Sequence, residues 1–220
     1  PKAKNTIVMG PFSHGGWSHE MGKHFHNEIY FGDSIATFYQ KNIETPFFDH
    51  YLKNPKSSYN LPEAYMFDTG KKEWKQFAEW PPKAAQKTQF YLRENGKFTT
   101  ETPSSASFTE YFSDPNKPVP SSENLKDFNG FTPRNYMSED QRFTENRPDV
   151  ASFTTEILSD DITLAGEIKV KLKIASTGSD ADFFVKLIDI YPADEKNIKE
   201  KPGVIYGNYH QMVRSEIMPA

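Results

Sequence analysis

The residues best suited to acid–base chemistry lie in one short loop near the start of the sequence. The eight residues from Gly10 to Trp17 read G-P-F-S-H-G-G-W and follow the apolar run of residues 6–9. An imidazole titrates near neutral pH and can act as a general base, and glycines let the backbone pass close to a substrate. These features make His14 a candidate catalytic base. The alternative is a loop histidine bonded to a neighbouring carbonyl.

A serine candidate follows in residues 30–36, which read Y-F-G-D-S-I-A. This segment resembles the G-D-S-L block of an esterase family whose base comes from a C-terminal D-x-x-H. The nearest counterpart, Gly207 to His210, lacks the aspartate. Neither Ser13 nor Ser18 lies in the G-x-S-x-G pattern of a nucleophile elbow. The favoured role of Ser34 is therefore that of a helix N-cap.

Metal binding and a substrate pocket are the other chemical possibilities. An H-x-H pattern can bind metal, but no ordered set of carboxylates accompanies the three histidines of this region, and a solvated loop is favoured. These residues are His19, His24 and His26. The acidic pairs further along suit turns better than a calcium site. They are Asp160 with Asp161 and Asp180 with Asp182. Trp17, beside His14, either lines an acyl pocket or serves packing. We expect no metal site.

Composition excludes several classes of protein. The 220 residues carry a net charge of −4 with both signs interspersed, so we expect no nucleic-acid partner. No apolar run approaches the roughly 18 residues of a membrane span, and we expect no membrane partner. The absence of cysteine excludes disulfides, thiol catalysis and cysteine-ligated zinc.

The first 60 residues predict a strand, a loop and a helix. Residues 6–9 form a short apolar run that is typical of a strand buried on both faces of a parallel sheet. Nothing in the sequence that follows suggests a neighbour for this strand. Apolar residues at near-helical spacing predict a mostly helical segment over about 33–52, which Asp33 or Ser34 would cap and Pro46 would kink or restart. Residues 1–60 therefore resemble the last unit of an α/β sheet.

From residue 61 onward, prolines separate short strand-like stretches, which predicts an antiparallel β-sandwich. The clearest stretches are 64–67, 88–92, 107–112, 151–156, 162–174 and 182–190. Within 162–174 three lysines alternate with Val170, Leu172 and Ile174, so we expect these apolar side chains to point inward. The predicted fold is mostly β: a domain of residues 61–220 formed by a jelly-roll, galactose-binding-like sandwich, whose C-terminus we expect to be incomplete. It follows the strand–loop–helix remnant of an α/β-hydrolase domain in residues 1–60.

Several motifs resemble one hydrolase family, in the same order along the chain. The loop V-M-G-P-F-S-H-G-G-W is similar to that family's G-P-W-x-H-G, with Phe12 in place of the common tryptophan. Residues 46–53 resemble its helix ending F-F-D-x-Y-L-K, and residues 67–82 resemble its T-G-x-x-x-W and W-P-P motifs. Further segments agree at 111–120, 139–143, 147–150 and 186–192. The family contains α-amino-acid ester hydrolases, cocaine esterase, X-Pro dipeptidyl-peptidases and glutaryl-cephalosporin acylase-like proteins.

The resemblance implies a serine hydrolase or acyltransferase with a Ser-Asp-His triad, of which only the position of His14 lies in this sequence. The serine and the aspartate would precede Pro1, and the 220 residues alone would be inactive. Substrates would be small esters or amides of α-amino acids, including β-lactam-type acyl groups, and no cofactor is expected. The expected partner is the remainder of the hydrolase domain, and a homo-oligomer is left open.

A non-catalytic β-sandwich that serves binding or assembly is the alternative function. In this alternative the first 60 residues are an appendage to the sandwich. The family resemblance favours a periplasmic or secreted location and leaves the bacterial cytoplasm open.

Overall fold

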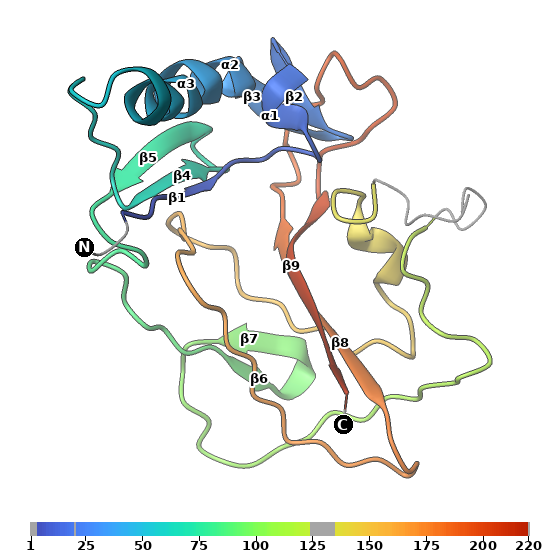
Figure 1. The fold of residues 1–220 in the computed structure, drawn as a ribbon. Coiled ribbons are helices and arrows are strands. Elements are labelled where there is room, and N and C mark those ends of the chain that lie inside the picture. Colours follow the sequence, from blue (N-terminus) through green and yellow to red (C-terminus); the bar gives the residue numbers. More distant parts are fainter. Residues whose placement is uncertain (1–3, 20, 124–134, 220) are drawn as a thin grey trace. The chain divides into compact units, whose positions relative to one another are not determined.

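The computed structural model describes residues 4–19, 21–123 and 135–219 (Figure 1). The predicted domains also include residues 1–3, 20, 124–134 and 220, which lie outside the described residues. The chain divides into two compact units. The first comprises residues 1–86 and 162–169, and the second comprises residues 87–161 and 170–220. This division does not coincide with the predicted boundary near residue 60.

Three strands form the sheet of the first unit, in the order β1-β4-β5. They are β1 (Ile7–Met9), β4 (Ala64–Asp68) and β5 (Glu73–Phe77). The apolar run is therefore a strand, as predicted, but the expected burial on both faces is wrong: Ile7 and Met9 are 44% and 59% exposed, because β1 lies at the edge of the described sheet. It pairs in parallel with β4, with Val8 opposite Tyr65, whereas β4 and β5 are antiparallel. The expectation that β1 lacks a neighbour in the following sequence is wrong, because β4, 55 residues downstream, fills that place.

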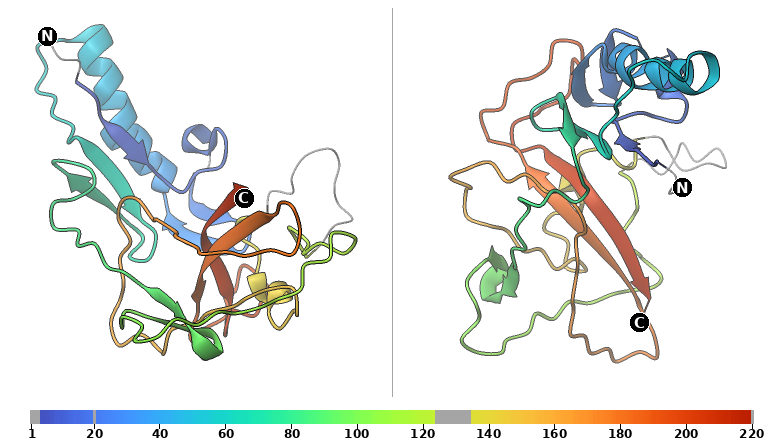
Figure 2. Two further views of the ribbon diagram at one scale, coloured as in Figure 1. Left: turned by 90° about the horizontal axis from the view of Figure 1, so that it is seen from below. Right: turned by 60° about the vertical axis from the view of Figure 1, so that its left-hand side comes forward.

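The connection from β1 to β4 crosses over the sheet, since parallel strands cannot be joined by a tight turn. It begins with a short helix, α1 (Gly16–His19), and an antiparallel hairpin of β2 (Lys23–His26) and β3 (Ile29–Asp33). A long helical stretch follows, in which α-helical and wider π-helical segments alternate. These are α2 (Ile35–Tyr39), η1 (Gln40–Glu44), α3 (Thr45–Phe48) and η2 (Asp49–Lys53). Figure 2 shows them as one continuous rod.

The helical stretch confirms the helix that was predicted over about 33–52. Ser34 occupies the N-cap position in a left-handed conformation (φ 55°), but its side chain makes no capping hydrogen bond. Pro46 lies in the first turn of α3, directly after the π-helical segment η1. The backbone keeps right-handed helical angles through Glu44 and Thr45, so the predicted kink or restart at Pro46 is not borne out. Because proline has no N–H to donate, its place after the wider π-helical segment lets the helix continue through it.

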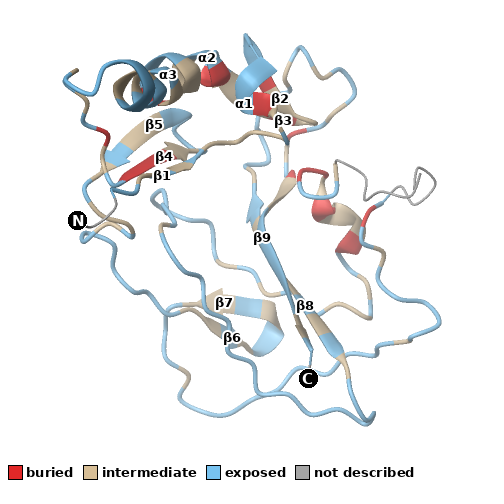
Figure 3. Cartoon of the chain, in the orientation of Figure 1, coloured by how far each residue is buried: buried red, intermediate tan, exposed pale blue. Residues whose placement is uncertain are grey.

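The core of the first unit joins the helical stretch to the sheet. The buried residues that form its central cluster are Ile43, Leu61 and Tyr65. Partly buried side chains complete it, namely Val8, Phe38, Tyr39, Tyr59 and Trp74. The rings of Phe38 and Trp74 stack at 5.9 Å with an interplanar angle of 12°, a favourable geometry for aromatic pairs. Figure 3 shows buried residues on α2 and β4.

Two hairpins form the described strands of the second unit. The short one pairs β6 (Tyr91–Arg93) with β7 (Lys97–Thr99) through the 3₁₀ turn η3 (Glu94–Gly96). The long one pairs β8 (Asp182–Ile190) with β9 (His210–Pro219), with a register shift between Leu187 and Ile188. A further 3₁₀ turn, η4 (Gln141–Thr144), lies between the two hairpins in the sequence.

The predicted strands after residue 60 are confirmed only in part. Those at 64–67 and 182–190 are present as β4 and β8, while 88–92 overlaps only the start of β6. Residues 107–112 and 162–174 form no strand, and 151–156 contributes a single bridge at Thr154. The chain is nonetheless β-rich with few helices, as expected.

The segment 162–174 corrects a specific expectation. Its apolar residues Val170, Leu172 and Ile174 are 37–47% exposed rather than inward-facing, and its three lysines are exposed as well. A strand needs a neighbour to satisfy its backbone N–H and C=O groups, and no ladder joins this segment to the described residues. The alternating pattern alone therefore does not make it a strand.

We predict that Ile43→Ala destabilises the chain by roughly 2–4 kcal/mol, because it removes a core side chain that is only 3% exposed. Leu52→Ala, in the same helical stretch but 75% exposed, serves as control and should change the free energy of unfolding by less than about 0.5 kcal/mol. Urea denaturation measures both. Equal effects of the two substitutions would contradict the assigned core.

Candidate active site

The loop that carries His14 begins where β1 ends. The Phe12 N–H donates to the Gly10 carbonyl at 2.9 Å, and the Gly16 N–H donates to the Ser13 carbonyl at 2.9 Å, so the loop closes in two tight turns. A Cβ atom at Gly10 would lie 2.5 Å from the Phe12 ring and 2.8 Å from the Trp74 ring. The close approach of these rings explains why glycine is required at this position.

His14 is exposed at the tip of this loop. Its ring contacts the Trp17 ring edge to face, with 6.5 Å between the centroids and an interplanar angle of 72°. Gly15, the next residue, adopts a left-handed conformation (φ 76°), which glycine accepts without strain. Within the described residues no carboxylate hydrogen-bonds to His14. An imidazole in this state is accessible to a substrate but has no orienting partner here.

Trp17 is held in place through its backbone as well as its ring. Its carbonyl accepts a hydrogen bond of 2.7 Å from the Gln40 side chain of η1, which ties α1 to the helical stretch. The Trp17 side chain is 37% exposed. It therefore presents an apolar surface beside His14, and the two predicted site residues lie together.

The other histidines near the loop differ from one another. His24 is only 2% exposed; it lies on β2, its Nε2 bonds to the Pro11 carbonyl, and its ring meets the Phe12 ring edge to face at 5.7 Å. The expectation of a solvated loop is wrong for His24, which packs against Pro11 and Phe12 of the His14 loop. His26 lies half-buried on the same strand, whereas His19 is exposed.

No site emerges around Ser34. Its backbone N–H donates to the Gly22 carbonyl at 2.6 Å, and it lines an open hollow of about 350 Å³. The other lining residues include acidic, basic and aromatic side chains but no histidine: Asp33, Ile35, Phe38, Phe67, Lys72, Glu73 and Trp74. A serine nucleophile is activated by a base that hydrogen-bonds to its hydroxyl, and within the described residues no side chain of this hollow bonds to the Ser34 hydroxyl.

The described residues contain no group of three or more histidine, cysteine or acidic side chains placed to hold a metal ion. In the acidic pairs, Asp160 accepts from the Ser159 hydroxyl at 2.9 Å and Asp180 accepts from the Ser179 hydroxyl at 2.8 Å. These are local turn contacts. A search for membrane-spanning helices, limited to the described residues, finds no helix of sufficient length and apolarity.

Comparison with known proteins relates the chain to hydrolases. Residues 58–214 match the model of a family described as the X-Pro dipeptidyl-peptidase C-terminal non-catalytic domain. The chain is 29% identical over 220 residues to the cocaine esterase of Rhodococcus sp. (strain MB1 Bresler). That match covers 95% of this chain and 37% of the esterase.

Two solved structures resemble the model. One is an aminopeptidase from the marine sediment archaeon Thaumarchaeota archaeon, with a TM-score of 0.78 and 29% identity over 98% of this chain and 34% of the other. The second is an α-amino acid ester hydrolase labelled with selenomethionine, with a TM-score of 0.80 and 29% identity over 98% of this chain and 35% of the other. The chain thus spans little more than a third of the length of these relatives.

We predict effects of different size on the free energy of unfolding for two histidine substitutions in this region. His14→Ala should change the free energy of unfolding by less than about 0.5 kcal/mol, because the side chain is exposed. His24→Ala should cost roughly 1–3 kcal/mol, because it removes a buried hydrogen bond and ring contacts. Thermal melts of the two variants provide the measurement, and a His14→Ala variant as unstable as His24→Ala would assign His14 a structural role.

Proposed function

This chain belongs to the family of X-Pro dipeptidyl-peptidase C-terminal domains, and from that premise we propose that it is part of a serine hydrolase acting on esters or amides of α-amino acids. The observation that supports this proposal is that His14 is exposed on a tight glycine loop at the end of a parallel strand. The family match begins at residue 58, so the His14 loop lies outside the domain that the family describes as non-catalytic.

We propose that the first residues are the end of an α/β-hydrolase domain. The parallel pair β1–β4 with a helical crossover supports this assignment for residues 1–60. For residues 61–220 we propose a jelly-roll, galactose-binding-like sandwich, which the two antiparallel hairpins of the second unit support.

In the proposed mechanism a serine outside these 220 residues attacks the carbonyl carbon of the substrate. His14 Nε2 takes the proton of the serine hydroxyl as the new C–O bond forms, and it then gives that proton to the leaving alcohol or amine as the acyl-enzyme forms. Water or an acceptor amine attacks the acyl-enzyme by the same route. An aspartate, also outside the chain, would accept from Nδ1 and orient the ring.

Trp17 would line the acyl side of this site. Its partly exposed ring lies against His14, where it can contact an apolar acyl group. The substrate class rests on the relatives, one of which is named as an α-amino acid ester hydrolase. We extend it to β-lactam-type acyl groups. The partner of the chain would be the remainder of the hydrolase domain.

A non-catalytic binding or assembly module remains the second candidate, because the matched family is described as non-catalytic. The sequence of the parent polypeptide distinguishes the hydrolase from the non-catalytic module. A G-x-S-x-G motif between a strand and a helix, upstream of residue 1, supports the hydrolase. Its absence supports the module.

For the parent protein we predict that His14→Ala lowers kcat roughly 10³-fold or more and changes KM little, since a general base acts in the transition state. His19→Ala, an exposed histidine on α1 five residues away, should stay within a few-fold of wild type. Steady-state kinetics on an α-amino-acid ester measure both variants. Near-normal turnover in a folded His14→Ala protein would overturn the proposal.

For the 220-residue chain alone we predict no measurable turnover of p-nitrophenyl esters, because most of the rate depends on the serine and its oriented attack. The control is a comparison of the unmodified chain with His14→Ala, which should both match the buffer rate. Turnover that survives His14→Ala would indicate another nucleophile in the chain. Ser34→Ala would then be the first variant to test.

A further inference from the structure

A turn of the second unit, residues 138–144, is polar and yet buried. Gln141 is 0% exposed and Glu139 is 8% exposed, and Ser138 and Thr144 are buried as well. Burial of polar side chains is unfavourable unless each finds a hydrogen-bond partner. The partners of this turn therefore show what it holds together. Figure 3 shows the buried residues of the second unit gathered around η4.

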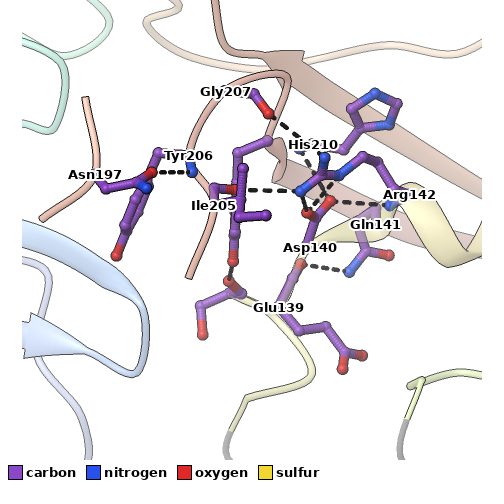
Figure 4. Close-up of polar contacts among 11 residues, drawn as sticks. Glu139, Asp140, Gln141, Arg142, Asn197, Ile205, Tyr206, Gly207 and His210 are labelled. Carbon is purple, nitrogen blue, oxygen red and sulfur yellow. Dashed lines mark hydrogen bonds and ion pairs between the residues drawn. The ribbon is translucent and has the colours of Figure 1, made fainter. Parts of the chain in front are cut away.

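Three of the bonds dock the turn on the long hairpin and on the residue before β9. The Tyr209 hydroxyl donates to the Ser138 carbonyl at 2.5 Å, and the Lys186 ammonium of β8 donates to the Gln141 side chain at 2.6 Å. The His210 N–H, at the start of β9, donates to the Asp140 carboxylate at 3.2 Å. Figure 4 shows this carboxylate bonded to both the His210 N–H and the Arg142 side chain.

Arg142 extends the docking to the segment before β9. Its guanidinium pairs with Asp140, with 2.6 Å between Nε and Oδ2. It also donates to the carbonyls of Ile205 and Gly207, at 3.2 Å and 3.4 Å. Asp140 and Arg142 thus join the turn to the loop 205–207 as well as to β9. Their charges are satisfied.

Glu139 is the exception in this network. Its Oε2 accepts from the Ser122 hydroxyl at 3.0 Å, but its Oε1 is buried and has no hydrogen-bond partner in the described part of the chain. A charged carboxylate with one empty oxygen is costly in such a site, whereas a neutral carboxylic acid is much less so. The Glu139 side chain can therefore stay buried at low cost only in its neutral, protonated form.

The groups that face Glu139 in the described residues do not remove this cost. Burial raises the pKa of Glu139, while the Ser122 hydroxyl, the Glu123 N–H and the Lys186 ammonium oppose the rise and the Glu123 carboxylate adds to it. Burial also lowers the pKa of Lys186, with the charge of Glu139 opposing. The net direction for Glu139 is upward, so protonation persists to a higher pH in the folded chain than in the unfolded chain.

We propose that Glu139 is a proton-operated lock on the turn 138–144. The protonated side chain lets the turn sit on β8 and β9 without a buried charge. Loss of the proton leaves a buried carboxylate whose Oε1 has no hydrogen-bond partner in the described residues, and the turn loosens from the hairpin. Because the folded-state pKa lies above the unfolded one, the stabilisation is complete below the ordinary glutamate pKa of about 4.3 and disappears as the pH rises through the folded-state value.

The test compares the 220-residue chain with Glu139→Gln, which mimics the protonated state. Local opening is measured by hydrogen exchange of the Arg142 and His210 amides, with both chains at the same pH. We expect equal protection at about pH 4. At higher pH the wild type should lose protection relative to Glu139→Gln, roughly tenfold for each unit by which the pKa is raised. Glu110→Gln, the same change at an exposed position, should match wild type throughout.

A second variant keeps the proposal testable if Glu139→Gln does not fold. Ser122→Ala removes the hydroxyl that favours the charged carboxylate, so it should shift the loss of protection to higher pH and deepen it. Wild-type and Glu139→Gln profiles that coincide at every pH would overturn the proposal. An unmoved profile in Ser122→Ala would do the same.

Discussion

The parallel pairing of β1 with β4 is the constraint on which the first unit depends. Parallel strands require a crossover, so the chain between Met9 and Ala64 must leave the end of β1 and return to the start of β4. The His14 loop is the first part of this excursion, and the helical stretch 35–53 is its return path over the sheet. Ile43 and Tyr65 anchor the stretch to β4. The position of His14 thus follows from strand pairing and core packing, and the loop itself adds only local turns.

The second unit depends on polar contacts to a greater degree. An isolated two-stranded hairpin is only marginally stable in water, and the β8–β9 hairpin exposes Phe184 and Ile217, which lie directly opposite each other. The turn 138–144 supplies bonds to both strands and buries Tyr209 at their base. The second unit is therefore stabilised more by directional hydrogen bonds than by apolar burial. The proposed lock makes its stability respond to the charge state of the buried Glu139 carboxyl group.

Sequence patterns predicted the elements whose side chains match a single period. The apolar run of β1, the helical spacing after Ser34 and the strand β8 were all predictable in this way. The hairpin β2–β3 was not, because histidines 24 and 26 lie among polar residues and indicate a loop until His24 is seen to pack under Phe12. The opposite error occurred at 162–174, where a strand pattern exists without a partner strand. Periodicity describes which face a side chain prefers, but pairing decides whether a strand forms.

The candidate site was predictable only as far as its local chemistry. The glycine-rich loop after a strand identified His14, and the neighbouring ring of Trp17 followed from the spacing. The resemblance implied an orienting aspartate outside this sequence, and the structure adds that His14 is exposed and bonds to no carboxylate within the described residues. These are also the features that a triad completed from outside the chain requires.

The most direct test of the account is the location of the nucleophile in the parent protein. A fluorophosphonate that labels activated serines would be applied to the parent and to its His14→Ala variant, and the labelled peptide identified by mass spectrometry. The proposed triad predicts a single labelled serine outside residues 1–220, with a labelling rate that falls at least about a hundredfold in the variant. Label on a serine within these residues, or an unchanged rate without His14, would contradict it.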